Sequence, residues 1–292
     1  MPQQVVVNSR AVRIVSLLPG ATETLFALGV GDSVVGVTHE CDHPAAARER
    51  PSVTRPTLEL EGLNGGEVEA RVAAAAASGQ PLYELDVGRL RRLAPDLVVA
   101  QDVCRVCAVP AEQVIQELDG SRVLRQHPHS LEDVLVGMAE LASACGVDPE
   151  PLVGGLRARI AAAASAASRR RAVRGVFLEW LDPPYPAGHW TPDLLRLAGI
   201  EDPLARPGRP SLAVDWDTVK AARPEVVLVA PCGFDLEQAR KETDRQAAQL
   251  SALGADRLVV FDGSSYFNRP GPRLVESLEM LVREAASIMP CG

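Results

Sequence analysis

Short apolar runs alternate along the chain with longer segments in which apolar residues recur at helical spacing. The runs rich in β-branched residues predict buried strands at residues 12–17, 34–37, 97–100, 121–124, 173–179, 226–230 and 258–261. Helical spacing and capping residues predict helices at residues 22–28, 66–77, 86–93, 130–144, 192–198, 215–222, 236–253 and 272–288, with another beginning at Pro110. This repeated order of strand, loop and helix predicts an α/β fold with mostly parallel sheets.

A long alanine-rich segment separates the two strand–helix series. Residues 149–171 contain no proline beyond the first turn, so we expect one helix of roughly 35 Å, at 1.5 Å per residue. The sequence therefore predicts two Rossmann-like lobes, residues 11–148 and 172–292, joined by a connecting backbone helix at 149–171. We expect ligand chemistry to lie in the cleft between these lobes.

Composition narrows the range of partners. The chain has 292 residues, 47% hydrophobic and 23% charged, and carries 30 basic against 38 acidic residues. The net charge of −8 argues against nucleic acid or an anionic membrane surface as the main partner. No apolar run approaches the ~20 residues of a membrane span. The N-terminal residues do not resemble a secretory signal, which predicts a cytoplasmic protein; a periplasmic or extracellular location is the alternative if the chain is a trimmed mature form.

The cysteines suggest a metal centre. Cys104 and Cys107 form a Cys-x-x-Cys loop directly after a predicted strand, and Cys41 and Cys232 each follow another strand. Ligands of open α/β sheets bind beyond the carboxyl ends of the strands. We therefore predict that these four thiols meet in the interlobe cleft as metal ligands. One Cys-x-x-Cys with two scattered cysteines favours an iron–sulfur cluster, with zinc as the alternative.

Histidines offer a second set of possible ligands. His39, Cys41 and His43 alternate and would share one face if the strand continued that far. Pro44 favours an irregular loop instead, with surface histidines. His127 and His129 also lie in a loop after a strand, where exposed histidines are the expectation and a position facing the cleft is the alternative.

The few aromatic residues gather in two loops of the second lobe. Flat apolar rings suit a planar or macrocyclic ligand. An arginine near the start of the last helix can either anchor an anionic ligand or hold acidic residues across the cleft. The predicted ligand contacts are Trp180, Tyr185, Trp190, Tyr266, Phe267 and Arg269.

Four segments carry a family resemblance. They are residues 14–23 (IVSLLPGATE), 93–98 (LAPDLV), 186–195 (PAGHWTPDLL) and 268–273 (NRPGPR). Together they resemble the helical-backbone (class III) substrate-binding proteins of the cobalamin-binding and ferric-siderophore type, over almost the whole chain. Because its N-terminal residues do not resemble a secretory signal, the chain resembles a cytosolic branch of that family.

The resemblance implies a non-enzymatic protein that holds a small metal-containing ligand, such as a corrinoid, between its lobes. It also implies an ABC importer as partner, with Glu23 as a candidate docking carboxylate. The cysteines add an iron–sulfur cluster as a second possible cleft ligand. A redox or catalytic iron–sulfur or zinc metalloprotein is the alternative, with carboxylates available at Glu40, Asp42, Asp102 and Glu179. No pair of them has a spacing that indicates catalysis, so we assign no catalytic residue.

Overall fold

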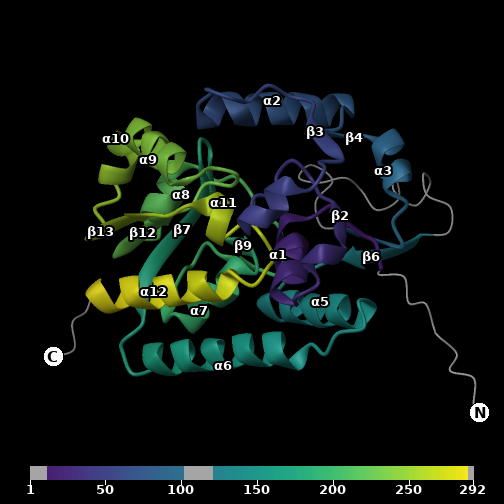
Figure 1. Cartoon of the computed structure of the whole chain (residues 1–292). Coiled ribbons are helices and arrows are strands. Elements are labelled where there is room, and N and C mark those ends of the chain that lie inside the picture. Colours follow the sequence, from purple (N-terminus) through teal and green to yellow (C-terminus); the bar gives the residue numbers. More distant parts are fainter. Residues whose placement is uncertain (1–11, 102–120, 289–292) are drawn as a thin grey trace, which may run out of the picture.

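The computed structural model describes residues 12–101 and 121–288 (Figure 1). The sheet of the first lobe has the order β2-β1-β5-β6, and every neighbouring pair is parallel. Its strands are β1 (Ile14–Ser16), β2 (Val34–Gly36), β5 (Leu97–Gln101) and β6 (Arg122–Gln126). The side chains from Leu97 to Ala100 are at most 2% exposed, because both faces of β5 are covered. This explains the continuous apolar run there.

The first lobe also contains helices. They are α1 (Pro19–Ala27), α2 (Gly65–Ser78), α3 (Val87–Leu93) and α5 (Leu131–Ala144), with the short 3-10 helices η1 (Gly31–Ser33) and η2 (Ala45–Glu49). Asp86 and Ser130 cap α3 and α5 as expected, each accepting a backbone N–H three residues on. The sequence predicted no strand between residues 38 and 96. Instead, β3 (Thr54–Pro56) pairs antiparallel with β4 (Tyr83–Leu85), and α2 lies between them in sequence.

The second lobe repeats the architecture. Its sheet has the order β10-β7-β12-β13, all parallel, and β8 adds antiparallel to β7. The strands of the second lobe, in this sheet and outside it, are β7 (Val173–Leu181), β8 (Pro184–Pro186), β9 (Gly188–His189), β10 (Ile200–Glu201), β11 (Arg206–Pro207), β12 (Val226–Val229) and β13 (Arg257–Val260). Its helices are α7 (Thr191–Leu197), α8 (Trp216–Ala221), α9 (Leu236–Arg245), α10 (Ala247–Ser251), α11 (Gly263–Tyr266) and α12 (Leu274–Ile288). The mostly parallel α/β fold is confirmed, although the single helix expected at 236–253 is divided at Gln246.

Helix α6 (Glu150–Ala167) connects the two series along the base of the molecule (Figure 1). Its 18 residues span about 27 Å at 1.5 Å per residue, less than expected, because the helix ends at Ser168 before the three arginines. It packs against both α5 and α12.

The base of the two lobes is one continuous apolar core. Leu131 and Met138 of α5 belong to the same buried cluster as Leu194 of α7 and Leu278 of α12. The lobes are therefore joined by packing as well as by the chain. Within the two described ranges, no helix has the length and apolarity needed to cross a membrane.

Candidate functional site

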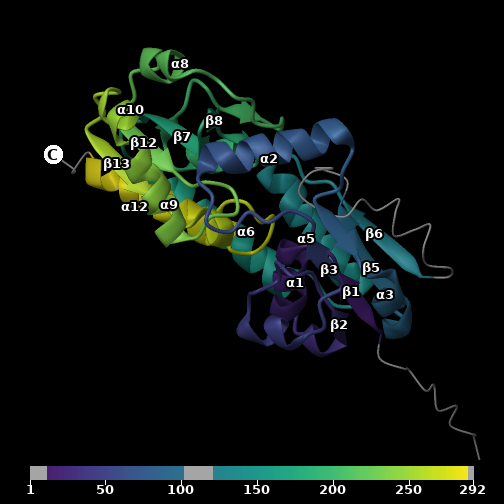
Figure 2. The same cartoon turned by 90° about the horizontal axis from the view of Figure 1, so that it is seen from above.

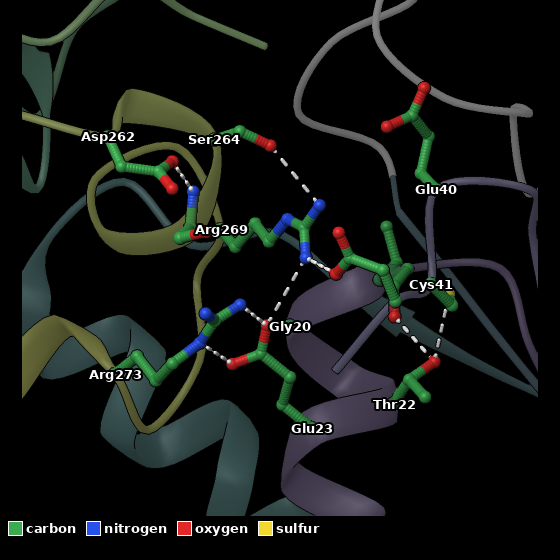
Figure 3. A network of polar contacts seen from close by, with 12 residues as sticks. Gly20, Thr22, Glu23, Glu40, Cys41, Asp262, Ser264, Arg269 and Arg273 are labelled. Atoms are coloured by element: carbon green, nitrogen blue, oxygen red, sulfur yellow. Dashed lines mark hydrogen bonds and ion pairs between the residues drawn. The ribbon is translucent and has the colours of Figure 1, made fainter. Parts of the chain in front are cut away.

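Above this core, an ion network joins the lobes where α1 faces the loop between α11 and α12 (Figure 3). Arg273 donates to both carboxylate oxygens of Glu23, over 2.9 Å and 2.5 Å. Arg269 forms a short ion pair with Asp42, lies 3.6 Å from Glu23, and donates to Ser264 over 3.2 Å. The Glu23 and Arg269 side chains are 3% and 8% exposed. Opposite charges from the two lobes therefore neutralise one another, with Glu23 and Arg269 shielded from water and Asp42 partly exposed.

The backbone also closes tightly at this point. A Cβ atom added to Gly20, at the start of α1, would lie 2.7 Å from the carbonyl carbon of Pro270. Such a separation is shorter than side chains adopt, so glycine at this position lets the first lobe approach the loop that carries Arg269.

The network decides the role of Arg269. Burial alone raises the pKa of Asp42, but the hydrogen bond and charge of Arg269 outweigh it and hold that pKa below its ordinary value. Asp42 is therefore ionised and already matches the Arg269 charge. Of the two roles considered for Arg269, its ion pair with Asp42 agrees with holding acidic residues across the cleft, and anchoring an anionic ligand would require Asp42 to leave.

Cys41 lies beside this network as a buried thiol, 4% exposed. Its Sγ is 3.1 Å from Thr22 Oγ1 and 3.2 Å from Thr38 Oγ1. Burial raises the pKa of Cys41 despite these hydrogen bonds, which favours the neutral thiol over the thiolate that binds metals. Nearby, His39 is engaged by Thr54 Oγ1, 2.7 Å from its Nδ1. His39, Cys41 and His43 are therefore not gathered into one ligand set, and His43 is exposed.

Three imidazoles meet between the lobes. His127 and His129 follow β6 of the first lobe and lie edge to face, with ring centroids 4.3 Å apart. His189 of β9, in the second lobe, stacks on His129 at 5.9 Å. The Nδ1 atoms of His129 and His189 are buried and have no hydrogen-bond partner among the described residues. Burial first, and then the neighbouring imidazoles, lower the pKa of His189, so it stays neutral with its lone pair available.

Sequence reasoning missed His189. It occupies a left-handed backbone position, with φ of 50°, in a segment that was interpreted as loop. The local signals were its neighbour Trp190 and its place in the segment 186–195, which carries part of the family resemblance. The alternative position of His129, facing the cleft, agrees with its contact with His189 across the lobes.

Two of the predicted aromatic ligand contacts lie in the hydrophobic core instead. Phe267 is 1% exposed and packs against Phe177 and Phe261, with ring centroids at 5.0 Å and 5.2 Å. Trp190 is 8% exposed and its indole N–H donates to the Phe267 carbonyl oxygen over 2.8 Å. The two loops fold back onto the sheet and bury both rings, which does not favour their prediction as ligand contacts.

The other three aromatic residues are also engaged within the protein. The indole N–H of Trp180 donates to Asp182 O over 3.1 Å, and its ring packs on Phe234. The Tyr266 ring lies 5.5 Å from the Arg273 guanidinium carbon. The Tyr185 hydroxyl donates to Glu69 of α2, in the first lobe, over 2.8 Å. Of these, only Tyr185 makes a side-chain hydrogen bond across the lobes.

A hollow of about 300 Å³ opens beside His127, one of the three imidazoles. Its lining comes from the first lobe, including His127 and Asp133, except for Pro270 of the second lobe, and neither His129 nor His189 lines it. This volume is at the lower end of the range for ligand pockets.

Residues 14–259 match the family model described as periplasmic binding protein, which covers most of the chain. The chain belongs to this family. It is 25% identical over 297 residues to a vitamin B12-binding protein of Yersinia pestis (strain Pestoides F), which covers 95% of this chain and 88% of that protein.

Solved structures of periplasmic binding proteins share the fold. The periplasmic vitamin B12-binding protein of Vibrio cholerae aligns with a TM-score of 0.67 at 21% identity, over 96% of this chain and 98% of that one. The apo periplasmic haem-binding protein from Roseiflexus sp. RS-1 aligns with a TM-score of 0.69 at 22% identity, over 96% and 99% of the two chains. At these identities the likeness shows the fold alone.

The four-thiolate site stays a prediction. Cys104 and Cys107, like Asp102, lie outside the described residues, and Cys232 is exposed. In residues 12–101 and 121–288, no three or more His, Cys, Asp or Glu side chains are arranged to hold a metal ion. The raised pKa of Cys41 does not favour its assignment as a thiolate ligand.

Two carboxylates also have roles other than those considered for them. Glu23 is 4% exposed and paired with Arg273, so it does not present a docking surface for an importer. Glu179 accepts the Gly188 N–H over 2.8 Å and a hydrogen bond from Ser211, and burial raises its pKa. Glu179 thereby supports the β9 segment that carries His189.

Proposed function

We propose that the protein binds a metal-bearing tetrapyrrole, a corrinoid or haem, between its lobes. The observation that carries the proposal is the pair His129 and His189, which face each other from opposite lobes with unpartnered, buried Nδ1 atoms. A neutral imidazole is a good ligand for iron or cobalt. The vitamin B12-binding and haem-binding relatives support the ligand class.

The remaining residues of the site suit a carrier rather than an enzyme. Asp42 is neutralised by Arg269, and Glu179 is held by Gly188 and Ser211. Neither carboxylate is free to transfer protons to a bound ligand. The imidazoles can therefore hold and orient the ligand while the surrounding ion pairs keep the lobes together. Delivery of the ligand to an ABC importer is a further part of the proposal, and it is supported by membership of the family.

Spectroscopic titration tests this function. Hemin and aquocobalamin are added separately to the purified protein, and the visible bands are followed. We expect a band shift with one of them, and an affinity at least about tenfold weaker in His129→Ala and His189→Ala, since even the groups that support metal ligands are worth about that much. His43→Ala, an exposed histidine of the first lobe, is the matched control and should bind like the wild type. If neither probe shifts its bands, or all four proteins bind equally, the proposal fails.

The iron–sulfur or zinc hypothesis requires Cys41 as a thiolate together with Cys104, Cys107 and Cys232. The hydrogen-bonded, buried thiol of Cys41 argues for the tetrapyrrole instead. Anaerobic purification followed by iron, sulfide and zinc analysis separates the two. Stoichiometric metal that disappears in Cys104→Ser would support the four-cysteine site, and metal-free protein that still binds hemin or aquocobalamin would support the tetrapyrrole.

A further inference from the structure

Helix α2 belongs to the first lobe but reaches the second. It is attached at both ends to the β3–β4 pair, which packs on the first lobe through Val53 and Leu85. Figures 1 and 2 show it crossing the top of the molecule, from above the second lobe to the side of β3 and β4. Only Gly65 and Ala75 of its 14 residues are buried. A helix of this length with so little packing opens more readily than the cores beneath it.

Three contacts tie the N-terminal half of α2 to the second lobe. The Tyr185 hydroxyl donates to Glu69 over 2.8 Å. A Cβ atom at Gly65 would lie 2.7 Å from Oε1 of Glu242, a carboxylate that is 2% exposed. A Cβ atom at Gly66 would lie 2.6 Å from Oδ2 of Asp182. The two glycines thus bring the start of the helix, where the helix dipole favours negative charge, close to two carboxylates.

The rest of the lobe interface is less free to open. It contains the buried Glu23–Arg273 pair, the Gly20–Pro270 backbone contact and the shared core of α5, α7 and α12. The contacts described above between α2 and the second lobe, by contrast, are one hydrogen bond and the packing of two glycines. Tyr185 belongs to β8, and His189 follows four residues later in the chain, in β9.

We propose that residues 57–82, which contain α2, form a strap that closes over the interlobe site and must detach from the second lobe for ligand to enter or leave. The strap swings on the β3–β4 pair while the two lobes keep their relative positions. The identity of the ligand rests on the proposed function, whereas the movement of the strap does not.

Hydrogen exchange tests the strap without any ligand. Tyr185→Phe and Glu69→Gln should each accelerate exchange of the α2 amides by about tenfold, the effect of losing one hydrogen bond to a charged group. The amides of α6 should be unchanged. Glu61→Gln, which removes the same charge from the strap outside α2, is the matched control. Unchanged α2 exchange in both Tyr185→Phe and Glu69→Gln would overturn the proposal.

A reversible cross-link tests the link to ligand exchange. In Gly66→Cys with Asp182→Cys, the new thiols are within disulfide reach, because a Cβ at position 66 lies 3.2 Å from the Cγ position at 182. Peptide mass spectrometry establishes the bond against the native cysteines. The oxidised protein should take up hemin or aquocobalamin at least about tenfold more slowly than its reduced form, and the wild type should show no such difference.

Equal rates of uptake by the oxidised and reduced double variant would overturn the proposal that the strap must detach. Absence of uptake by every protein, reduced forms included, would count against the tetrapyrrole and leave the hydrogen-exchange result to decide on the strap.

Discussion

Arg273 and Glu23 form a two-point ion pair between the lobes, although 250 residues separate them in the chain. Both side chains are largely buried, at 13% and 3% exposure. A buried pair adds little over an apolar contact, but removing one partner leaves an uncompensated charge. The pair therefore makes the arrangement of the lobes sensitive to single substitutions.

Replacing Glu23 should be strongly destabilising. We expect Glu23→Gln to lower the free energy of unfolding by about 3–5 kcal/mol, because Arg273 would keep its charge in a buried position. Urea denaturation measures the loss. Glu279→Gln is the matched control, since Glu279 also accepts two hydrogen bonds from one arginine, Arg159, but at the surface. Glu279→Gln should lower the free energy of unfolding much less than Glu23→Gln, and equal losses in the two variants would contradict the role of burial.

Adding a methyl group at Gly20 should push the lobes apart. Gly20→Ala places a Cβ against the Pro270 backbone, which cannot rotate away as a side chain can, so we expect a loss of about 1–3 kcal/mol. Gly155→Ala in α6 is the control, because no atom lies within 4 Å of its added Cβ. That variant should gain about 0.5–1 kcal/mol from helix propensity. Thermal unfolding of both proteins checks the opposite signs.

Asp202 should make stability depend on pH. Burial raises the pKa of Asp202 from 3.8 to about 6, although backbone N–H groups of Phe177 and Leu204 donate to it. The folded state then binds more protons than the unfolded state between these values, so this contribution is complete below the unfolded pKa and is lost as pH rises through about 6. The shift corresponds to about 3 kcal/mol.

Comparison with Asp202→Asn isolates this effect, because asparagine does not titrate. Relative to the variant, the wild type should lose about 3 kcal/mol of stability between about pH 4 and pH 7. Urea unfolding at several pH values gives the difference. A difference that stays flat with pH would show that Asp202 titrates normally.

The described cysteines should differ sharply in reactivity. Cys41 is buried with a raised pKa, whereas Cys232 is exposed. Iodoacetamide should modify Cys232 at least about tenfold faster than Cys41, because only an accessible thiolate reacts. Mass spectrometry of the digested protein follows both sites. Rapid modification of Cys41 would indicate a thiolate there and would revive its assignment as a metal ligand.

Much of the fold was determined by local pattern. The continuous apolar runs at β5 and β12 predicted strands covered on both faces, and Asp86 and Ser130 predicted the starts of α3 and α5. These features depend only on residues that are close together in the sequence. The β3–β4 pair was missed because its strands have three residues each and lie on either side of a whole helix.

The candidate site was decided by tertiary structure. The sequence identified Arg269 and left two roles open, and packing placed its guanidinium against Asp42. It interpreted Trp190 and Phe267 as ligand contacts, because composition shows that rings gather in loops but not whether those loops fold back onto the core. The meeting of His129 with His189 depends on how two lobes close over a shared base. Periodicity reports the face a side chain takes within its own element, whereas contact between distant elements depends on the packing of the whole chain.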